Sequence, residues 1–105
     1  MKKMQKPSNA QNHLHAGHRQ RLKNKFVEYG LRSFNEHEVL ELMLTYSIPY
    51  KDTNALAHKL LDMYGSIYDV CNAKFEDLIA NNGIGRESAI YLNLLSQFCD
   101  VFYAS

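Results

Sequence analysis

Apolar side chains recur every three or four residues from Gly17 to the C-terminus. No sustained stretch alternates apolar and polar residues, as a half-buried strand would. The pattern therefore predicts an all-α fold, a compact bundle of five to six short helices.

The first predicted helix covers residues 18–29 and ends at Gly30. Leu22, Phe26 and Tyr29 would share its apolar side. The other sides carry most of its basic residues, Arg19, Arg21, Lys23 and Lys25.

The second predicted helix begins after Asn35, which has the spacing of a capping box with Glu38. Its interior is almost wholly apolar, so we expect it at the centre of the core. Pro49 cannot continue a helix, and the chain should bend over residues 47–51. The apolar residues of this helix are Val39, Leu40, Leu42, Met43, Leu44 and Tyr46.

Three further helices are predicted before the last one. Asp52 can cap the third, which would end at Gly65, and Ser66 can cap a short fourth. The fifth would lie near residues 74–81. The last helix begins after Gly85 and is still apolar at its end, so we expect another segment to pack there. Its candidate core residues are Ile90, Leu92, Leu94, Leu95, Phe98 and Phe102.

A weak internal repeat links two turns. The apolar pair at 42–43 precedes Ile48 by the same interval as the pair at 78–79 precedes Ile84. This predicts two helix-turn-helix units that face one another, although echoes this short also arise by chance among leucine-rich helices.

The second turn has a glycine on each side of one apolar residue. Gly83 can take the left-handed conformation that ends a helix, and Gly85 lets another atom approach the backbone closely. Ile84 can enter the core. Ser88 is small enough to let two helices lie close together.

The segment LIANNGIGRESAIYLNLL resembles the helix-hairpin-helix motif, which binds the DNA backbone without reading sequence. The free amides at the start of the last helix could hold one phosphate oxygen. Arg86 would add a charge-assisted contact, whereas Glu87 would oppose it. The other turn, at residues 47–49, has no glycine and should be structural.

Basic residues are concentrated early in the chain. The composition, 46% hydrophobic and 22% charged over 105 residues, is that of one small globular domain. Residues 1–30 carry seven basic and one acidic side chain, a net +6, whereas residues 31–105 carry five basic and ten acidic, a net −5. A protein that touches a polyanion with one end has this polarity. A solubilising tail followed by an exposed helix face would produce the same uneven distribution of charge.

Residues 1–16 predict a flexible basic tail, and residues 17–105 the helical domain. The tail lacks the apolar stretch of a signal peptide, and no apolar run is long enough to cross a membrane, so we expect a cytoplasmic protein. Cys71 and Cys99 could pair on number alone. Their apolar neighbours favour buried free thiols instead.

The residue pattern predicts neither catalysis nor metal binding. Glu38 and Glu41 suit a helix cap and a solvated helix face better than an acid/base pair. We therefore expect no enzyme activity, no catalytic residue, no metal and no cofactor. The histidines suit the tail, the surface and the rim of the core; they are His13, His15, His18, His37 and His58.

A larger resemblance covers residues 17–103. The segments GHRQRLKNKFVEYG, HEVLELMLTYSIPYKDTNALAHKLL and YGSIYDV resemble, in order, the N-terminal region of the RadC family, also called the UPF0758 or DUF2466 family. The resemblance implies a tandem helix-hairpin-helix fold, normally followed by a JAB/MPN-type domain with a zinc site. The motifs of that second domain are absent from this sequence. Many family hairpins have Pro and Lys where Arg86 and Ser88 stand here.

These observations support two functions. One is a non-catalytic, sequence-nonspecific DNA-binding module with a link to DNA repair or recombination. The alternative is a protein-interaction module that docks a JAB/MPN-type domain or another partner through the last helix, which could also pair two copies of the chain. The predicted DNA contacts are Gly83, Ile84, Gly85, Arg86, Ser88, Arg19, Arg21, Lys23 and Lys25.

Overall fold

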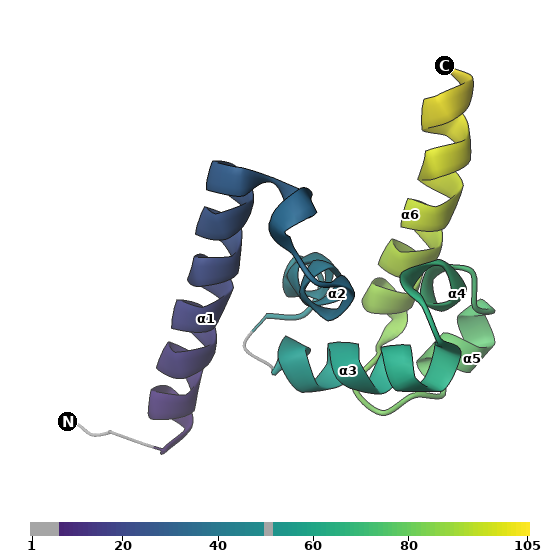
Figure 1. Ribbon diagram of the computed structural model, residues 1–105. Coiled ribbons are helices and arrows are strands. Elements are labelled where there is room, and N and C mark those ends of the chain that lie inside the picture. Colours follow the sequence, from purple (N-terminus) through teal and green to yellow (C-terminus); the bar gives the residue numbers. More distant parts are fainter. Residues whose placement is uncertain (1–6, 50–51) are drawn as a thin grey trace.

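The fold is built from helices (Figure 1). The computed structural model describes residues 7–49 and 52–105, with side chains from Ala16 onward, and these residues contain no strand. The all-α prediction is confirmed. The elements are α1 (Pro7–Tyr29), the 3-10 helix η2 (Leu31–Ser33), α2 (Glu36–Thr45), α3 (Thr53–Tyr64), α4 (Ile67–Cys71), α5 (Phe75–Ile79) and α6 (Arg86–Ala104).

Local hydrogen bonds fix the helix starts that the sequence predicts. Before α2, the amide of Asn35 donates to Glu38 Oε1 at 2.9 Å. Asp52 Oδ1 accepts from the backbone amide three residues on at 3.1 Å, and Ser66 Oγ does the same at the start of α4. Gly65 ends α3 with φ of 102°, a conformation that favours glycine.

Helix α2 lies at the centre of the core, as predicted. It packs against α1 on one side and along α3 on another. Leu40 and Leu44 are fully buried, and the end of the helix leads into buried Ile48. The core cluster is completed by Ala57, Leu60, Val70, Cys71, Leu78, Ile84, Ala89 and Leu92.

Helix α1 begins at Pro7, well before residue 18, so the predicted start was wrong. The added turns are polar, and a helix without an apolar stripe gives no periodic signal. Among the described side chains of α1, Leu22 is buried while Phe26 and Tyr29 are exposed, so the apolar side is narrower than predicted. The division at residue 17 stays a prediction; residues 1–6 and the side chains at 13 and 15 lie outside the described part.

Helix α6 is buried only near its start. Ala89 and Leu92 are in the core, whereas Leu94, Phe98 and Phe102 are exposed, so only part of the candidate core set is buried. Figure 1 shows its C-terminal half projecting from the other helices. Cys99 is therefore exposed rather than buried. No helix in the described ranges is both long and apolar enough to cross a membrane.

Candidate nucleic-acid interface

The two turns of the predicted repeat lie side by side. Ser88 Oγ, in the first turn of α6, donates to Ser47 Oγ, in the turn after α2, at 3.1 Å. Ile48 and Ile84 both point into the core, with 6% and 4% of their surfaces exposed. The equivalent apolar residue of each turn therefore anchors it, and the backbone around each is left at the same surface. The bend was predicted over residues 47–51, of which residues 50 and 51 lie outside the described residues.

The glycines of the second turn have different roles. Gly83 has φ of 100°, which an L side chain rarely adopts. Gly85 has φ of −92° and caps α6 in an extended conformation. A Cβ atom at Gly85 would meet no atom within 4 Å, so the space beside this backbone is open. The turn needs glycine at Gly83 for its backbone conformation, whereas glycine at Gly85 leaves the backbone of the turn open to an approaching atom.

Charged side chains surround the opening of the second turn. Arg86 is exposed and lies over the ring of Phe75, with its guanidinium carbon 5.8 Å from the ring centre. Lys59 on α3 donates to the carbonyl oxygen of Asn82 at 3.4 Å. Glu87 is exposed beside them and partly offsets their charge. Ser88 is 3% exposed, so its hydroxyl joins the two turns rather than facing solvent.

Arg19 binds the end of α2. Its guanidinium donates to the carbonyl oxygen of Thr45 at 3.1 Å and to that of Ile48. These carbonyls have no partner within the helix ladder, and a cation suits the negative end of the helix dipole. Burial lowers the pKa of Arg19, although the charge of Glu41 opposes that effect.

The other basic residues predicted on α1 contact side chains of α1 or of α2 and its C-terminal end. Lys25 donates to Glu38 Oε1 at 3.3 Å, and Lys23 lies 4.9 Å from the ring centre of Tyr46. The exposed Arg21 lies 3.5 Å from His18 Nδ1. The structure brings Arg19 close to the first turn but does not join these three residues to the glycine turn.

Glu41 is buried, so its assignment to a solvated helix face was wrong. Only 1% of its surface is exposed. Its Oε2 contacts His18 Nε2, and its Oε1 accepts from Asn54 Nδ2 at 3.0 Å. His37 and His58 fit their predicted places, since their rings stack at the surface of α2 and α3 with ring centres 4.3 Å apart.

Lys59, Ser47 and Glu41 were missed as members of this region. Lys59 and Ser47 reach it only through packing between elements distant in sequence, so spacing carries no signal for them. For Glu41 the sequence did give a signal of burial, because this residue lies between the core residues Leu40 and Leu42. Within the described residues, no three His, Cys, Asp or Glu side chains converge as a metal site.

Two bacterial proteins are similar to most of this chain. A UPF0758 protein of Fusobacterium nucleatum is 41% identical over 87 residues, which cover 83% of the chain and 38% of that protein. A UPF0758 protein of Ruegeria pomeroyi is 37% identical over 78 residues, 74% of the chain and 35% of that protein. The chain thus spans little more than a third of their length. No family model and no solved structure matches it.

Proposed function

The chain belongs to the UPF0758 family, and we propose that it is a non-catalytic module that binds the DNA backbone without reading sequence. We further propose that it acts in the cytoplasm, in DNA repair or recombination. Binding to the DNA backbone, in repair or in recombination, requires no catalytic residue and no cofactor from the described residues.

The observation that carries the proposal is the bond between Ser88 and Ser47, which places the two turns at one surface. The amides that begin α6 follow Gly85, where a Cβ atom would meet no atom of residues beyond its two chain neighbours within 4 Å. Amides at the start of a helix, at the positive end of its dipole, suit a phosphate oxygen. Two adjacent turns could contact successive phosphates of one backbone.

The charges near the turns support weak binding. Arg86 and Lys59 add two cations at the second turn, and Glu87 removes part of their effect. Arg19 lies beside the first turn, but its guanidinium already donates to two carbonyl oxygens. To contact a phosphate it would have to share its N–H donors between them and the phosphate. Because few cations are involved, binding should be weak and its dependence on salt shallow. Because the contacts go to phosphates, binding should tolerate any sequence.

Fluorescence anisotropy with labelled duplex and branched DNA tests this proposal. We expect binding at low salt that an excess of unrelated sequence competes away. Arg86→Glu should weaken it roughly tenfold and reduce the salt slope by about 1. Gly85→Val should weaken it as well, because its side chain begins in the open space at Gly85 and would block the approach of a phosphate to the amides.

Arg32→Glu is the matched control, since Arg32 is an exposed cation on η2 rather than at the turns. It makes the same change of net charge and should alter affinity much less than Arg86→Glu. Equal effects of the two reversals, or no binding at low salt, would exclude a site at the turns.

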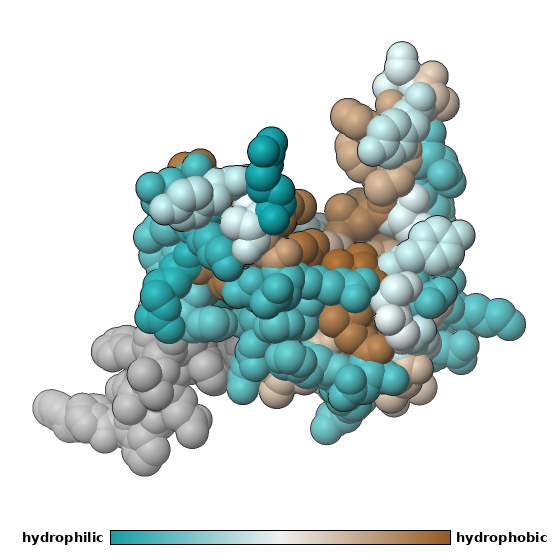
Figure 2. All heavy atoms as spheres, viewed as in Figure 1, coloured by the Kyte–Doolittle hydropathy of each residue, from teal (hydrophilic) through white to brown (hydrophobic). Residues whose placement is uncertain are grey.

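The projecting half of α6 favours a second candidate function, the docking of a protein partner. Phe98, Val101, Phe102 and Tyr103 are exposed along it, and Figure 2 shows apolar surface on α6 and in the hollow beside it. The related proteins are more than twice as long as the matched region. A JAB/MPN-type domain is the partner that we propose here.

If this second candidate is right, the chain should capture a purified JAB/MPN-type domain. Val101→Asp should abolish this capture and Arg86→Glu should leave it unchanged. DNA binding, in contrast, should be weakened by Arg86→Glu and unchanged by Val101→Asp. Sedimentation of the isolated chain separates a third outcome, in which α6 pairs two copies of the chain and Val101→Asp returns it to a monomer.

A further inference from the structure

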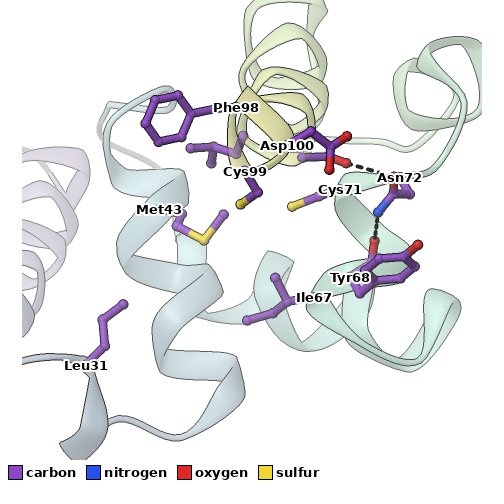
Figure 3. Close-up of a pocket in the computed structure, with 11 residues that line it drawn as sticks. Leu31, Met43, Ile67, Tyr68, Cys71, Asn72, Phe98, Cys99 and Asp100 are labelled. Atoms are coloured by element: carbon purple, nitrogen blue, oxygen red, sulfur yellow. Dashed lines mark hydrogen bonds between the residues drawn. The ribbon is translucent and has the colours of Figure 1, made fainter. Parts of the chain in front are cut away.

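An apolar groove opens between α2, α4 and α6, away from the two turns. Its volume is about 500 Å³, and Leu31 of η2 lies at one end. Ile67, Leu95 and Phe98 contribute much of its wall. Figure 2 shows the apolar hollow beside α6, and Figure 3 shows the side chains that line the groove.

Three sulfur atoms face this groove from three different helices. Met43 comes from α2, Cys71 from α4 and Cys99 from α6, and in Figure 3 their sulfur atoms point into the same space. Cys71 and Cys99 are the two cysteines of the chain. They lie close enough for the charge of one to affect the other: burial first, and then Cys99, raises the pKa of the Cys71 thiol to about 11.

The oxygen and nitrogen donors of the groove are largely occupied. Ser96 Oγ donates to Asn72 Oδ1 at 2.7 Å, and Asn72 Nδ2 donates to the carbonyl oxygen of Tyr68 at 2.8 Å. Asp100 adds one carboxylate at the exposed side. A hard cation such as Ca²⁺ needs about six to eight oxygen ligands, more than this wall offers.

We propose that Met43, Cys71 and Cys99 bind one Cu(I) ion through two thiolates and a thioether. Thiolate and thioether sulfur select Cu(I) over the harder divalent ions. Zinc is less suitable, because it takes four ligands in structural sites, and no third His, Cys, Asp or Glu joins the two thiols in the described part of the chain.

Ligation has an electrostatic cost at Cys71, because burial disfavours its thiolate. A bound Cu(I) ion supplies one positive charge against the two thiolates, and each thiol releases its proton to solvent when its sulfur joins the metal. Cys99 and the open side of the groove provide the entry path.

The test is transfer of Cu(I) from a chromogenic chelator to the reduced chain without oxygen. We expect one Cu(I) per chain, with the chain remaining the same size in native mass spectrometry. Apparent affinity should rise between about pH 6 and about pH 8, because binding displaces protons. Transfer that does not depend on pH would contradict thiolate ligation.

Substitutions locate the ion. Cys99→Ser should lower affinity more than about a hundredfold and Met43→Leu about tenfold. Met63→Leu is the matched control, because Met63 is exposed on α3 outside the groove, and it should have no effect. Cys71→Ser should also abolish transfer, but Cys99 is exposed, so the Cys99 variant gives the result that misfolding cannot explain.

Three results would overturn the proposal. One is a wild-type chain that takes no Cu(I) from the chelator. Another is a Cys99→Ser variant that binds as tightly as the wild type. The third is a metal that bridges two chains, seen as one Cu(I) per dimer, which would mean that the sulfurs of one groove do not converge on one ion.

Discussion

The Nε2 atom of His18 on α1 contacts the Oε2 atom of Glu41 on α2. The other oxygen of Glu41 accepts from Asn54 on α3. One buried carboxylate therefore joins three helices. Arg19, the next residue on α1, binds the carbonyl end of α2, and Leu22 is buried one turn later. The segment GHRQRL thus attaches α1 to the core.

Loss of the buried carboxylate should destabilise the whole domain. Glu41→Ala leaves His18 and Asn54 without their shared partner, and we expect a loss of about 1 to 2 kcal/mol in the free energy of unfolding. Urea denaturation followed by circular dichroism measures it. Glu28→Ala, at an exposed site of α1, should change stability by less than about 0.5 kcal/mol. Equal effects of the two changes would contradict the joining role of Glu41.

Arg19 and Arg21, two basic residues of α1, should contribute differently to stability in urea denaturation. Arg19→Ala leaves the carbonyls of Thr45 and Ile48 without their donor, and it should cost about 1 to 2 kcal/mol. Arg21→Ala removes an exposed side chain and should cost less than about 0.5 kcal/mol. If Arg19→Ala instead lowers DNA affinity at unchanged stability, its main role is in binding.

The two glycines of the second turn should respond differently to alanine. Gly83→Ala forces a side chain into φ of 100° and should cost about 1 to 2 kcal/mol. The added Cβ would lie 3.5 Å from Leu56 Cδ1, an ordinary contact, so the cost comes from the backbone. Gly85→Ala fits its φ and should be neutral or stabilise by about 0.5 kcal/mol. Equal costs would show that the turn conformation is not what requires glycine.

Caps and the core helix were predictable because their signals are local. Asp52 and Ser66 each accept from the backbone amide three residues on, and Glu38 accepts from the amide of Asn35 three residues back. The interior of α2 is a nearly continuous apolar run. The burial of Ile84 was also predicted, and the repeat in the sequence makes Ile48 its equivalent. Pattern alone therefore determined the fold class and most element boundaries.

What could not be predicted depends on contacts between distant residues. The apolar neighbours of Glu41 indicate its burial, but its partners His18 and Asn54 are distant in sequence and could not be predicted. The exposure of Phe98 and Cys99 likewise depends on where the other helices end, not on the apolar pattern of α6. The predicted phosphate contacts stay predictions.

The two thiols should differ in reactivity. The pKa of Cys71 is raised to about 11, so at about pH 8 its thiolate fraction is lower than that of an ordinary cysteine by a factor of several hundred. Iodoacetamide should therefore modify Cys99 first, and Cys71 only when the pH approaches 11 or the chain unfolds. Peptide mass spectrometry at several times measures both rates. Equal rates in the folded chain would contradict the burial of Cys71.

Glu38 should make stability depend on acid pH. The hydrogen bond from the Asn35 amide, helped by Lys25, lowers the pKa of this carboxyl in the folded chain, against the opposing effect of burial. Its stabilising effect is therefore complete above the ordinary glutamate pKa of about 4.3, and it is lost as the pH falls through the lower folded pKa.

Glu38→Gln does not titrate, so it isolates this effect. We expect the variant to be less stable than the wild type by about 0.5 kcal/mol near neutral pH. The difference should shrink when unfolding is measured at successively lower pH below about 4. Glu28→Gln, at an exposed site on α1, should match the wild type throughout. A difference between wild type and Glu38→Gln that persists or grows in acid would mean that the carboxylate is not preferentially stabilised in the folded chain.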